Sequence, residues 1–291
     1  MNPSTSIRYA MYRFLALIIR ALPLKGAYWL GLRICDLTYF FRPRERHAVE
    51  TNLRIILEYQ GIIPSEHILK GCARKTFQQF GKYLADFIRF RRLALKEIRR
   101  SVSISGMEYL EALHKSERGA ILVTAHYGNW ELGGAFIASM GLPFNAVVRP
   151  VASPAMERIY TFFREQRGMK IIHLDHVATG IIRALKRGEM VALVGDRDFT
   201  GTGLRRSFFG RETSLPHGAA WFAHRLKVPL VYGAVSRAPD DSYILRIHKP
   251  IDPGEVESEE EIQQKVEAMM QETIMRDPCQ WFIFDPFWPN A

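Results

Sequence analysis

The segment VTAHYGNWELGG, residues 123–134, places a histidine and an acid five positions apart, at His126 and Glu131. On one continuous helix these side chains would point about 140° apart, so the spacing does not suit a helical pair. It suits a strand that ends at the histidine, followed by a helix whose first turn carries the acid. Asn129 is a favourable N-cap for that helix, and Gly128 permits a sharp turn before it. The sequence therefore predicts that the chain folds back and brings Glu131 to His126.

This arrangement predicts a general base. A carboxylate that accepts a hydrogen bond from one imidazole nitrogen orients the ring and leaves the other nitrogen as an acceptor. Such a histidine removes a proton from a hydroxyl group, which typically contributes about 10²–10⁴ in rate. The short pattern also fits a structural histidine followed by a glutamate that favours a helix N-terminus. From these residues alone both interpretations stay open.

The elements around the motif predict an α/β fold, with a layered mixed sheet flanked by helices. From residue 101 onward, short apolar runs alternate with segments of helical period. The expected strands are residues 102–106, 120–125, 144–150, 170–174, 190–196, 229–237 and 243–250. The expected helices among them are residues 107–117, 130–140, 154–168, 178–188, 218–227 and 258–278.

In sheets of this kind, ligands usually bind beyond the carboxyl ends of the strands. The residues with suitable chemistry at or just beyond these predicted ends are His126, Arg149, Asp175 and Asp196. We therefore expect the functional site at this edge of the sheet.

Residues 1–42 are expected to form a separate pair of N-terminal hydrophobic helices, and residues 43–291 the main domain. The apolar stretch is interrupted by basic residues, namely Arg13, Arg20, Lys25 and Arg33. No stretch of about 18 residues is free of charge, so a standard spanning helix is not supported. We expect membrane-associating helices, with apolar faces in the interface and basic side chains toward lipid phosphates. The alternative is that these helices pack on the protein core.

Composition limits the partners. Forty Lys and Arg against thirty Asp and Glu give a net charge of +10, which favours anionic partners. The segment 89–100 concentrates basic residues and suits lipid phosphates or an acidic carrier protein. Its basic residues lack interleaved aromatics on a binding module, so we expect no nucleic-acid binding. The cysteines are few and widely spaced, which predicts neither a disulfide framework nor a zinc site.

Several blocks of the chain resemble the bacterial lipid A (late) acyltransferase family, within the wider glycerolipid and lysophospholipid acyltransferases. HYGNWE resembles the HX₄(D/E) motif of that family. The other blocks are VVRPVASPAMERIY, FFREQRGMKII, ALKRGEMVALVGDRDFTGTG, RSFFGRETSLPHGAAWFAHRLKVPLV and DPCQWFIFDPFW. Their order and spacing match from about residue 8 to residue 288, which implies a glycerolipid acyltransferase-like fold over nearly the whole chain.

The resemblance implies transfer of an acyl group from a thioester to a hydroxyl, with His126 as base and Glu131 as its orienting partner. It also implies an arginine–aspartate pair that binds the acceptor or positions the base. We favour Arg164 with Asp198 for this pair.

Other residues remain candidates for the same site. Arg167 could take the place of Arg164, and Asp196 could take the place of Asp198. Acyl transfer also needs positive charge or N–H donors near the developing oxyanion. Backbone amides at the start of the helix 130–140 are candidates, as are the side chains of Arg149 and Arg164.

The resemblance also implies the partners. The donor would be acyl carrier protein or acyl-CoA, and the acceptor a lipid A precursor in lipopolysaccharide biosynthesis. Another glycolipid or lysophospholipid, such as a mannosylated phosphoinositide, is the alternative acceptor. We expect no metal and no cofactor other than the thioester co-substrate. We expect the protein at the cytoplasmic face of the inner membrane, bound to anionic lipids.

Two other function classes each fit one feature. The segment GDRD, residues 195–198, resembles the Asp-x-Asp that holds a divalent cation in nucleotide-sugar glycosyltransferases, but no glycine-rich phosphate loop accompanies it. A basic lipid-binding protein of the membrane surface would explain the net charge and the N-terminal helices. It would not need titratable residues at the strand ends, so acyl transfer is the prediction.

Overall fold

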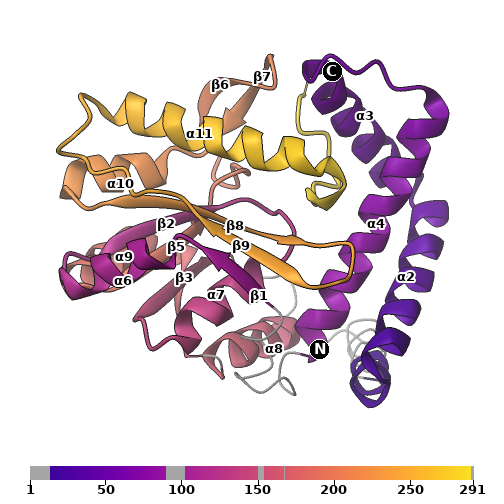
Figure 1. Ribbon diagram of the computed structural model, residues 1–291, viewed down its shortest axis with the longest axis horizontal. Coiled ribbons are helices and arrows are strands. Elements are labelled where there is room, and N and C mark those ends of the chain that lie inside the picture. The colour runs from indigo at the N-terminus through magenta and orange to yellow at the C-terminus, as the bar shows by residue number, and fades with distance from the viewer. Residues whose placement is uncertain (1–13, 90–101, 150–153, 167, 290–291) are drawn as a thin grey trace.

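The computed structural model describes residues 14–89, 102–149, 154–166 and 168–289. A seven-stranded sheet in the order β1-β9-β8-β2-β5-β3-β4 forms its centre (Figure 1). Its strands are β1 (Val102–Ser105), β2 (Ala120–Thr124), β3 (Phe144–Val148), β4 (Met169–His173), β5 (Met190–Val194), β8 (Leu230–Arg237) and β9 (Tyr243–Ile247). Strand β9 is antiparallel to β8, and the other neighbouring pairs are parallel. The predicted mixed α/β sheet is confirmed.

Helices cover both faces of the sheet. The helices are α6 (Met107–Lys115), α7 (Trp130–Ser139), α8 (Pro154–Glu165), α9 (Val177–Lys186), α10 (Gly218–Leu226) and α11 (Glu259–Arg276), with short 3-10 helices η1 (Leu174–His176) and η2 (Pro278–Gln280). Alternate residues of a strand point to opposite faces. Leu122 of β2 therefore packs in the core with residues of α6 and α7, while Ile121 packs with residues of α9, α10 and α11.

A second, two-stranded sheet was not expected from the sequence. Strands β6 (Leu204–Phe208) and β7 (Arg211–Leu215) form an antiparallel hairpin between β5 and α10. Their sequences, LRRSF and RETSL, are mostly polar and exposed, so they lack the apolar run that marks the other strands. Phe208 is nevertheless fully buried, and the indole of Trp288 donates a hydrogen bond to its carbonyl oxygen at 3.0 Å.

Three helices form a layer beside the sheet, at the right in Figure 1: α2 (Leu24–Phe41), α3 (Pro43–Tyr59) and α4 (Glu66–Arg89). Helices α2 and α4 touch through their backbones, because a Cβ on Gly31 would lie 2.7 Å from the carbonyl oxygen of Gly81. The predicted division after residue 42 falls between α2 and α3. Within the described ranges, no helix is long and apolar enough to cross a membrane. Residues 90–100 of the basic segment lie outside those ranges.

Candidate active site

His126 and Asp196 meet because their strands are neighbours in the sheet. Strand β2 pairs with β5 in parallel, with Thr124 opposite Val194. His126 lies two residues after the end of β2, and Asp196 lies two residues after the end of β5. Both residues therefore lie at the edge of the sheet where the sequence predicts the site.

Asp196 holds the histidine at two points. Nδ1 of His126 lies 2.7 Å from Oδ1 of Asp196, and the His126 backbone N–H donates to Oδ2 at 2.8 Å. The indole N–H of Trp281 donates to the same Oδ2 at 2.8 Å. Burial favours the neutral acid, but the charge interaction with His126 and these hydrogen bonds outweigh it and lower the pKa of Asp196.

An ionised Asp196 decides which imidazole nitrogen carries the proton. Because a carboxylate only accepts hydrogen bonds, Nδ1 is the N–H and Nε2 keeps its lone pair. The His126 side chain is 21% exposed and lines the central cavity. Nε2 is therefore the nitrogen available to a ligand, as a general base requires.

The turn after the histidine folds as predicted. Gly128 has a φ of 57°, and a Cβ there would lie 1.8 Å from the carbonyl oxygen of Val235. Oδ1 of Asn129 accepts a hydrogen bond from the Leu132 N–H at 3.1 Å, and α7 begins directly after Asn129. The glycine turn and the asparagine N-cap are confirmed.

The structure corrects the predicted contact between Glu131 and His126. Glu131 instead accepts hydrogen bonds from Arg164 of α8, at 2.5 Å from Nη2 and 3.2 Å from Nε. Burial disfavours the charge of this guanidinium, but Glu131 raises the pKa of Arg164. The acid fails to orient the imidazole because Asp196, from the neighbouring strand, already occupies Nδ1.

The favoured pair of Arg164 with Asp198 is also corrected. Asp198 accepts hydrogen bonds from the loop that follows it and from the β6–β7 hairpin. Its donors are the N–H groups of Thr200, Gly201 and Gly203 and the hydroxyls of Thr200 and Ser214. These bonds outweigh burial and lower the pKa of Asp198 to about 2. Asp198 therefore organises the loop 198–203 at the cavity wall.

Of the remaining predicted site residues, the structure places one in the cavity lining and one outside it. Arg149 lines the cavity, and Asp175 lies in η1 outside the cavity lining. Arg167 lies outside the described residues. The Asp-x-Asp segment does not present two open carboxylates, because Asp196 is engaged by His126 and Trp281 and Asp198 by its own loop.

A cavity of about 500 Å³ opens beside His126. Its inner wall is apolar and includes Leu110, Leu122, Ile137, Phe144, Leu245 and Ile247. Its polar lining includes His126, Glu131, Arg149, Arg164, Arg197 and Asp198. A pocket with both kinds of lining fits an amphiphile whose chain enters the apolar part.

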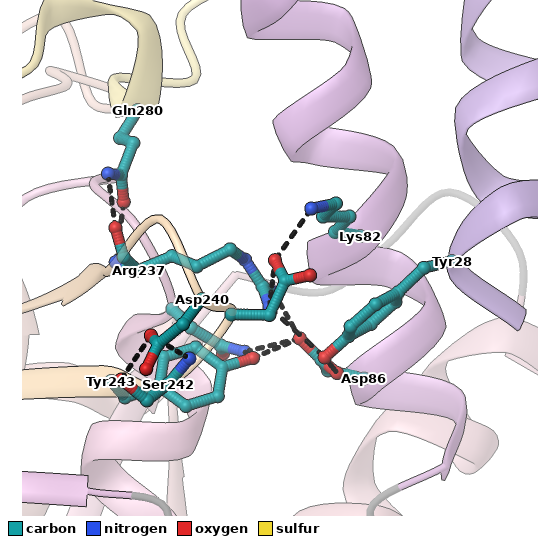
Figure 2. A network of polar contacts seen from close by, with 10 residues as sticks. Tyr28, Lys82, Asp86, Arg237, Asp240, Ser242, Tyr243 and Gln280 are labelled. Atoms are coloured by element: carbon teal, nitrogen blue, oxygen red, sulfur yellow. Dashed lines mark hydrogen bonds and ion pairs between the residues drawn. The ribbon is translucent and has the colours of Figure 1, made fainter. Parts of the chain in front are cut away.

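A buried polar network ties the turn from His126 to Asn129, the candidate catalytic turn, to the helical layer α2–α4. Figure 2 shows Asp86 of α4 pointing at Arg237 and Tyr243, with Tyr28 of α2 beside it. Asp86 accepts hydrogen bonds from both tyrosine hydroxyls and from the Arg237 guanidinium. The N-cap residue Asn129 donates to Asp86 at 3.4 Å and to the Tyr243 hydroxyl at 3.3 Å. The helices therefore support the start of α7 directly.

The C-terminal segment contributes residues whose roles sequence reasoning missed. Besides the Trp281 bond to Asp196, the Phe282 N–H donates to the His126 carbonyl at 2.8 Å. Gln280 exchanges hydrogen bonds with the backbone of Arg237 at 2.7 and 2.9 Å (Figure 2). The block DPCQWFIFDPFW was singled out only by resemblance. Nothing in its composition shows that it reaches the histidine.

The fold and site define an α/β protein with a histidine–aspartate pair at the polar end of an apolar cavity. Residues 2–289 match the family described as bacterial lipid A biosynthesis acyltransferase. The chain belongs to this family.

The similar proteins act on two kinds of acceptor. A phosphatidylinositol mannoside acyltransferase of Mycobacterium tuberculosis is 24% identical, over 70% of this chain and 65% of its own length. One of Mycolicibacterium smegmatis is 22% identical, over 93% of this chain and 88% of its own. The lipid A biosynthesis palmitoleoyltransferase of Escherichia coli is 25% identical, over 89% of this chain and 84% of its own length. This chain thus spans slightly less than two thirds of the M. tuberculosis relative.

Proposed function

We propose that this protein moves a fatty acyl chain from a thioester, acyl carrier protein or acyl-CoA, to a hydroxyl group of a lipid A precursor. The His126–Asp196 pair at the polar end of the cavity carries this proposal. Family membership supports acyl transfer as the reaction, and the apolar wall suits a fatty chain.

In this reaction Nε2 of His126 accepts the proton of the acceptor hydroxyl while the hydroxyl oxygen attacks the thioester carbonyl carbon. Asp196 stabilises the imidazolium that forms. The carbon–sulfur bond then breaks, and the imidazolium returns its proton to the thiolate. The ester and a free thiol are the products, and no covalent enzyme intermediate is required.

The start of α7 offers donors to the oxyanion. Among the described residues, the backbone N–H groups of Trp130 and Glu131 have no acceptor, whereas those of Leu132 and Gly133 are bonded to Asn129. Trp130 and Glu131 both line the cavity. N–H groups at a helix N-terminus stabilise negative charge that develops beside them.

The same proposal places the protein at the cytoplasmic face of the inner membrane, held by its N-terminal helices. Trp29, Leu37, Phe40 and Phe41 of α2 are exposed, Phe41 to 78%. Residues 29, 33, 37 and 40 follow one face of the helix, where Arg33, half exposed and 3.2 Å from Asp36, adds a basic group. An exposed apolar stripe with basic residues is typical of a helix in a membrane interface.

A mannosylated phosphoinositide is the second candidate acceptor. The named function of the mycobacterial relatives favours it, and that of the E. coli relative favours lipid A. The acceptor would differ between the two cases, but the chemistry at His126 would be the same.

The test combines cells and purified protein. Mass spectrometry of lipids from cells with and without the gene should show one lipid that gains the mass of a single acyl chain. Purified protein with palmitoyl-CoA or palmitoyl-acyl carrier protein should acylate that lipid, and H126A should not. A non-enzymatic lipid-binding protein would keep its membrane phenotype in H126A. Unchanged lipids together with no thioester consumption would contradict the proposal.

A further inference from the structure

A second cavity, of about 310 Å³, also borders the candidate catalytic turn. We call it the rear cavity. Its lining comes from β8, from β9 and the residue after it, and from the end of α11 with the segment that follows. His126 lines the central cavity, whereas the next residue, Tyr127, lines the rear cavity. Among the described residues, Ala234 alone lines both cavities, so the two are separate sites.

The rear cavity contains unused hydrogen-bonding groups. Four of its side chains have no hydrogen-bond partner in the part of the chain that the structure describes, namely Tyr127, Ser236, Arg246 and His248. Tyr127 is only 2% exposed. Polar groups as buried as this hydroxyl are usually hydrogen-bonded. Four unused groups around one cavity therefore indicate a polar ligand.

The charge of the rear cavity is positive. Two other charged residues of the lining have partners: Arg276 pairs with Glu272 at 2.6 Å, and Asp277 pairs with Lys75 at 3.3 Å. Arg246 has no ion pair with any residue that the structure describes. Its guanidinium therefore lacks a counter-charge, which an anion in the cavity would supply.

The imidazole of His248 lies among the same charges. Alternate residues of a strand share one face, so His248 follows Arg246 on the cavity side of β9. Burial lowers the pKa of His248, Glu272 opposes this shift, and Arg276 and Arg246 add to it. The imidazole is therefore neutral near pH 7 and offers one N–H, while Arg246 supplies the charge.

These groups define the chemical class of the ligand. A guanidinium binds carboxylate or phosphate oxygens in pairs through its planar donors. The volume equals that of on the order of ten water molecules, which exceeds a single inorganic ion. The rest of the wall includes Ala238, Pro239 and Ile244, which suit carbon atoms. The cavity thus fits an organic molecule of a few carbons that carries a carboxylate or a phosphate.

A ligand here would contact both sides of the candidate catalytic turn. Tyr127 forms an antiparallel bridge with Trp281, and the Gly128 N–H donates to the Gln280 carbonyl at 2.8 Å. Figure 2 shows Gln280 held against the backbone of Arg237, and both residues line the rear cavity. A molecule bound between Tyr127 and Gln280 would therefore restrain the turn.

We propose that the rear cavity binds a small organic oxyanion through Arg246, His248 and Tyr127, and that the bound anion stabilises the candidate catalytic turn. This is a second ligand site, additional to the proposed acyl-transfer site, and it does not depend on that reaction. Carboxylates and phosphate esters share the chemistry that the site recognises.

The first test measures binding by calorimetry with the full chain in neutral detergent and Tris–chloride buffer. The probes are citrate, glucose 6-phosphate, inorganic phosphate and uncharged glucose. Citrate or glucose 6-phosphate should bind with a Kd of about 1 mM or lower, and glucose should not bind. R246Q should weaken this binding at least about tenfold, because the charge-assisted pair is lost. Which of the two organic anions binds tells a carboxylate ligand from a phosphate ester.

Matched variants locate the binding. R149Q removes an arginine of the central cavity, and R225Q removes an exposed arginine that lines neither cavity, so both should bind like wild type. R246K keeps the charge without the planar fork and should weaken binding less than R246Q. Binding that is lost in R149Q but kept in R246Q and R246K would overturn the proposal. So would the absence of saturable binding up to about 10 mM, or binding of inorganic phosphate alone.

The second test measures the turn itself by hydrogen exchange. Saturating anion should slow amide exchange at residues 127–129 at least about threefold in wild type, since the bound state opens less often. R246Q at the same anion concentration should show no slowing. Unchanged exchange in saturated wild type would overturn the stabilisation of the turn. Neither test uses an acyl donor or acceptor, so a failure here is distinct from a failure of the proposed reaction.

Discussion

Asp196 has two side-chain partners that fix both its charge and its direction, His126 and Trp281. D196N should lower kcat about 10²–10⁴-fold, because the neutral amide no longer stabilises the imidazolium. W281F keeps the carboxylate and removes a single hydrogen bond, so its kcat should fall about tenfold. Steady-state kinetics with one donor and one acceptor measure both. A D196N enzyme within tenfold of wild type would show that Asp196 is not the partner of the base.

Glu131 and Arg164 should behave as one unit. Removing either side chain leaves the other as a largely buried charge without its partner. Such a loss lowers the free energy of unfolding by about 3 kcal/mol in other buried ion pairs and disturbs the site around the remaining charge. The double variant E131Q/R164Q should therefore lose no more kcat/KM than the worse single variant. E131Q combined with D196N serves as the comparison, because these two acids share no contact in the structure and their effects should add. Additive losses for Glu131 and Arg164 would contradict the observed pair.

At the residue scale, the sequence was informative where the chemistry is local. The turn at Gly128 and the cap at Asn129 depend on neighbours within a few positions, and both were predicted. Asp196 was predicted at the same sheet edge and as an alternative acid of the site, but Glu131 was predicted as the partner of His126. Asp196 is seventy positions away and reaches the imidazole only through the pairing of β2 with β5. Strand order cannot be read from apolar runs.

At the scale of elements, Asp86 joins α2, α4, β8 and β9. D86N should lower the free energy of unfolding by about 3 kcal/mol, because the buried Arg237 loses its buried counter-charge and keeps only the partly exposed Asp241, at 3.6 Å. Y28F removes the hydroxyl that donates to Asp86 and accepts from Arg237 but leaves the ion pair intact, so it should cost only about 1 kcal/mol. Urea unfolding measures both. Similar, small losses in the two variants would show that the ion pair does not stabilise this junction.

Glu189 joins three parallel strands by a different means. It accepts hydrogen bonds from Arg187, from Lys170 of β4 and from Asn145 of β3, and its pKa is lowered to about 2, mainly by Arg187. A lowered folded-state pKa gives stability that is present above the unfolded value near 4.5 and lost as pH falls toward 2.

The stability advantage of wild type over E189Q should therefore narrow by on the order of 1 kcal/mol between pH 7 and pH 3.5. Urea unfolding at several pH values measures it. E111Q is the control, since Glu111 is exposed on α6 and has no ion pair among the described residues. An advantage over E189Q that stays constant or widens on acidification would contradict the assignment.

The strands of the main sheet were predictable because each is a short apolar run between turn residues. The hairpin β6–β7 was not, because its strands are polar and are covered by the C-terminal segment only after folding. Helix α2 lies in the N-terminal stretch that was expected to be helical. The contact of the layer α2–α4 with the catalytic turn depends on Asp86 of α4, which carries no local signal.

At the scale of the whole molecule, α2 has two faces with different roles. Gly31 packs against Gly81 of α4, whose helix carries Asp86 to the catalytic turn, while Trp29 and Phe41 are exposed on α2. If the exposed face lies in a membrane interface, α2 fixes the position of the site relative to the lipid. The enzyme would then meet its lipid substrate without extracting it fully into water.

The triple variant W29S/F40S/F41S should reduce binding to vesicles of phosphatidylcholine and phosphatidylglycerol at least tenfold. Each exposed aromatic that enters the interface contributes on the order of 1 kcal/mol, and the loss of three exceeds one factor of ten. W221S is the matched control, because Trp221 is 41% exposed and its helix α10 lies at the left of Figure 1, away from α2 at the right. Co-sedimentation at low and high salt separates the apolar from the electrostatic part, since salt weakens only the latter. If the triple variant binds like wild type while W221S binds less, the interface lies on α10, and the helical layer supports the catalytic turn without holding the enzyme at the membrane.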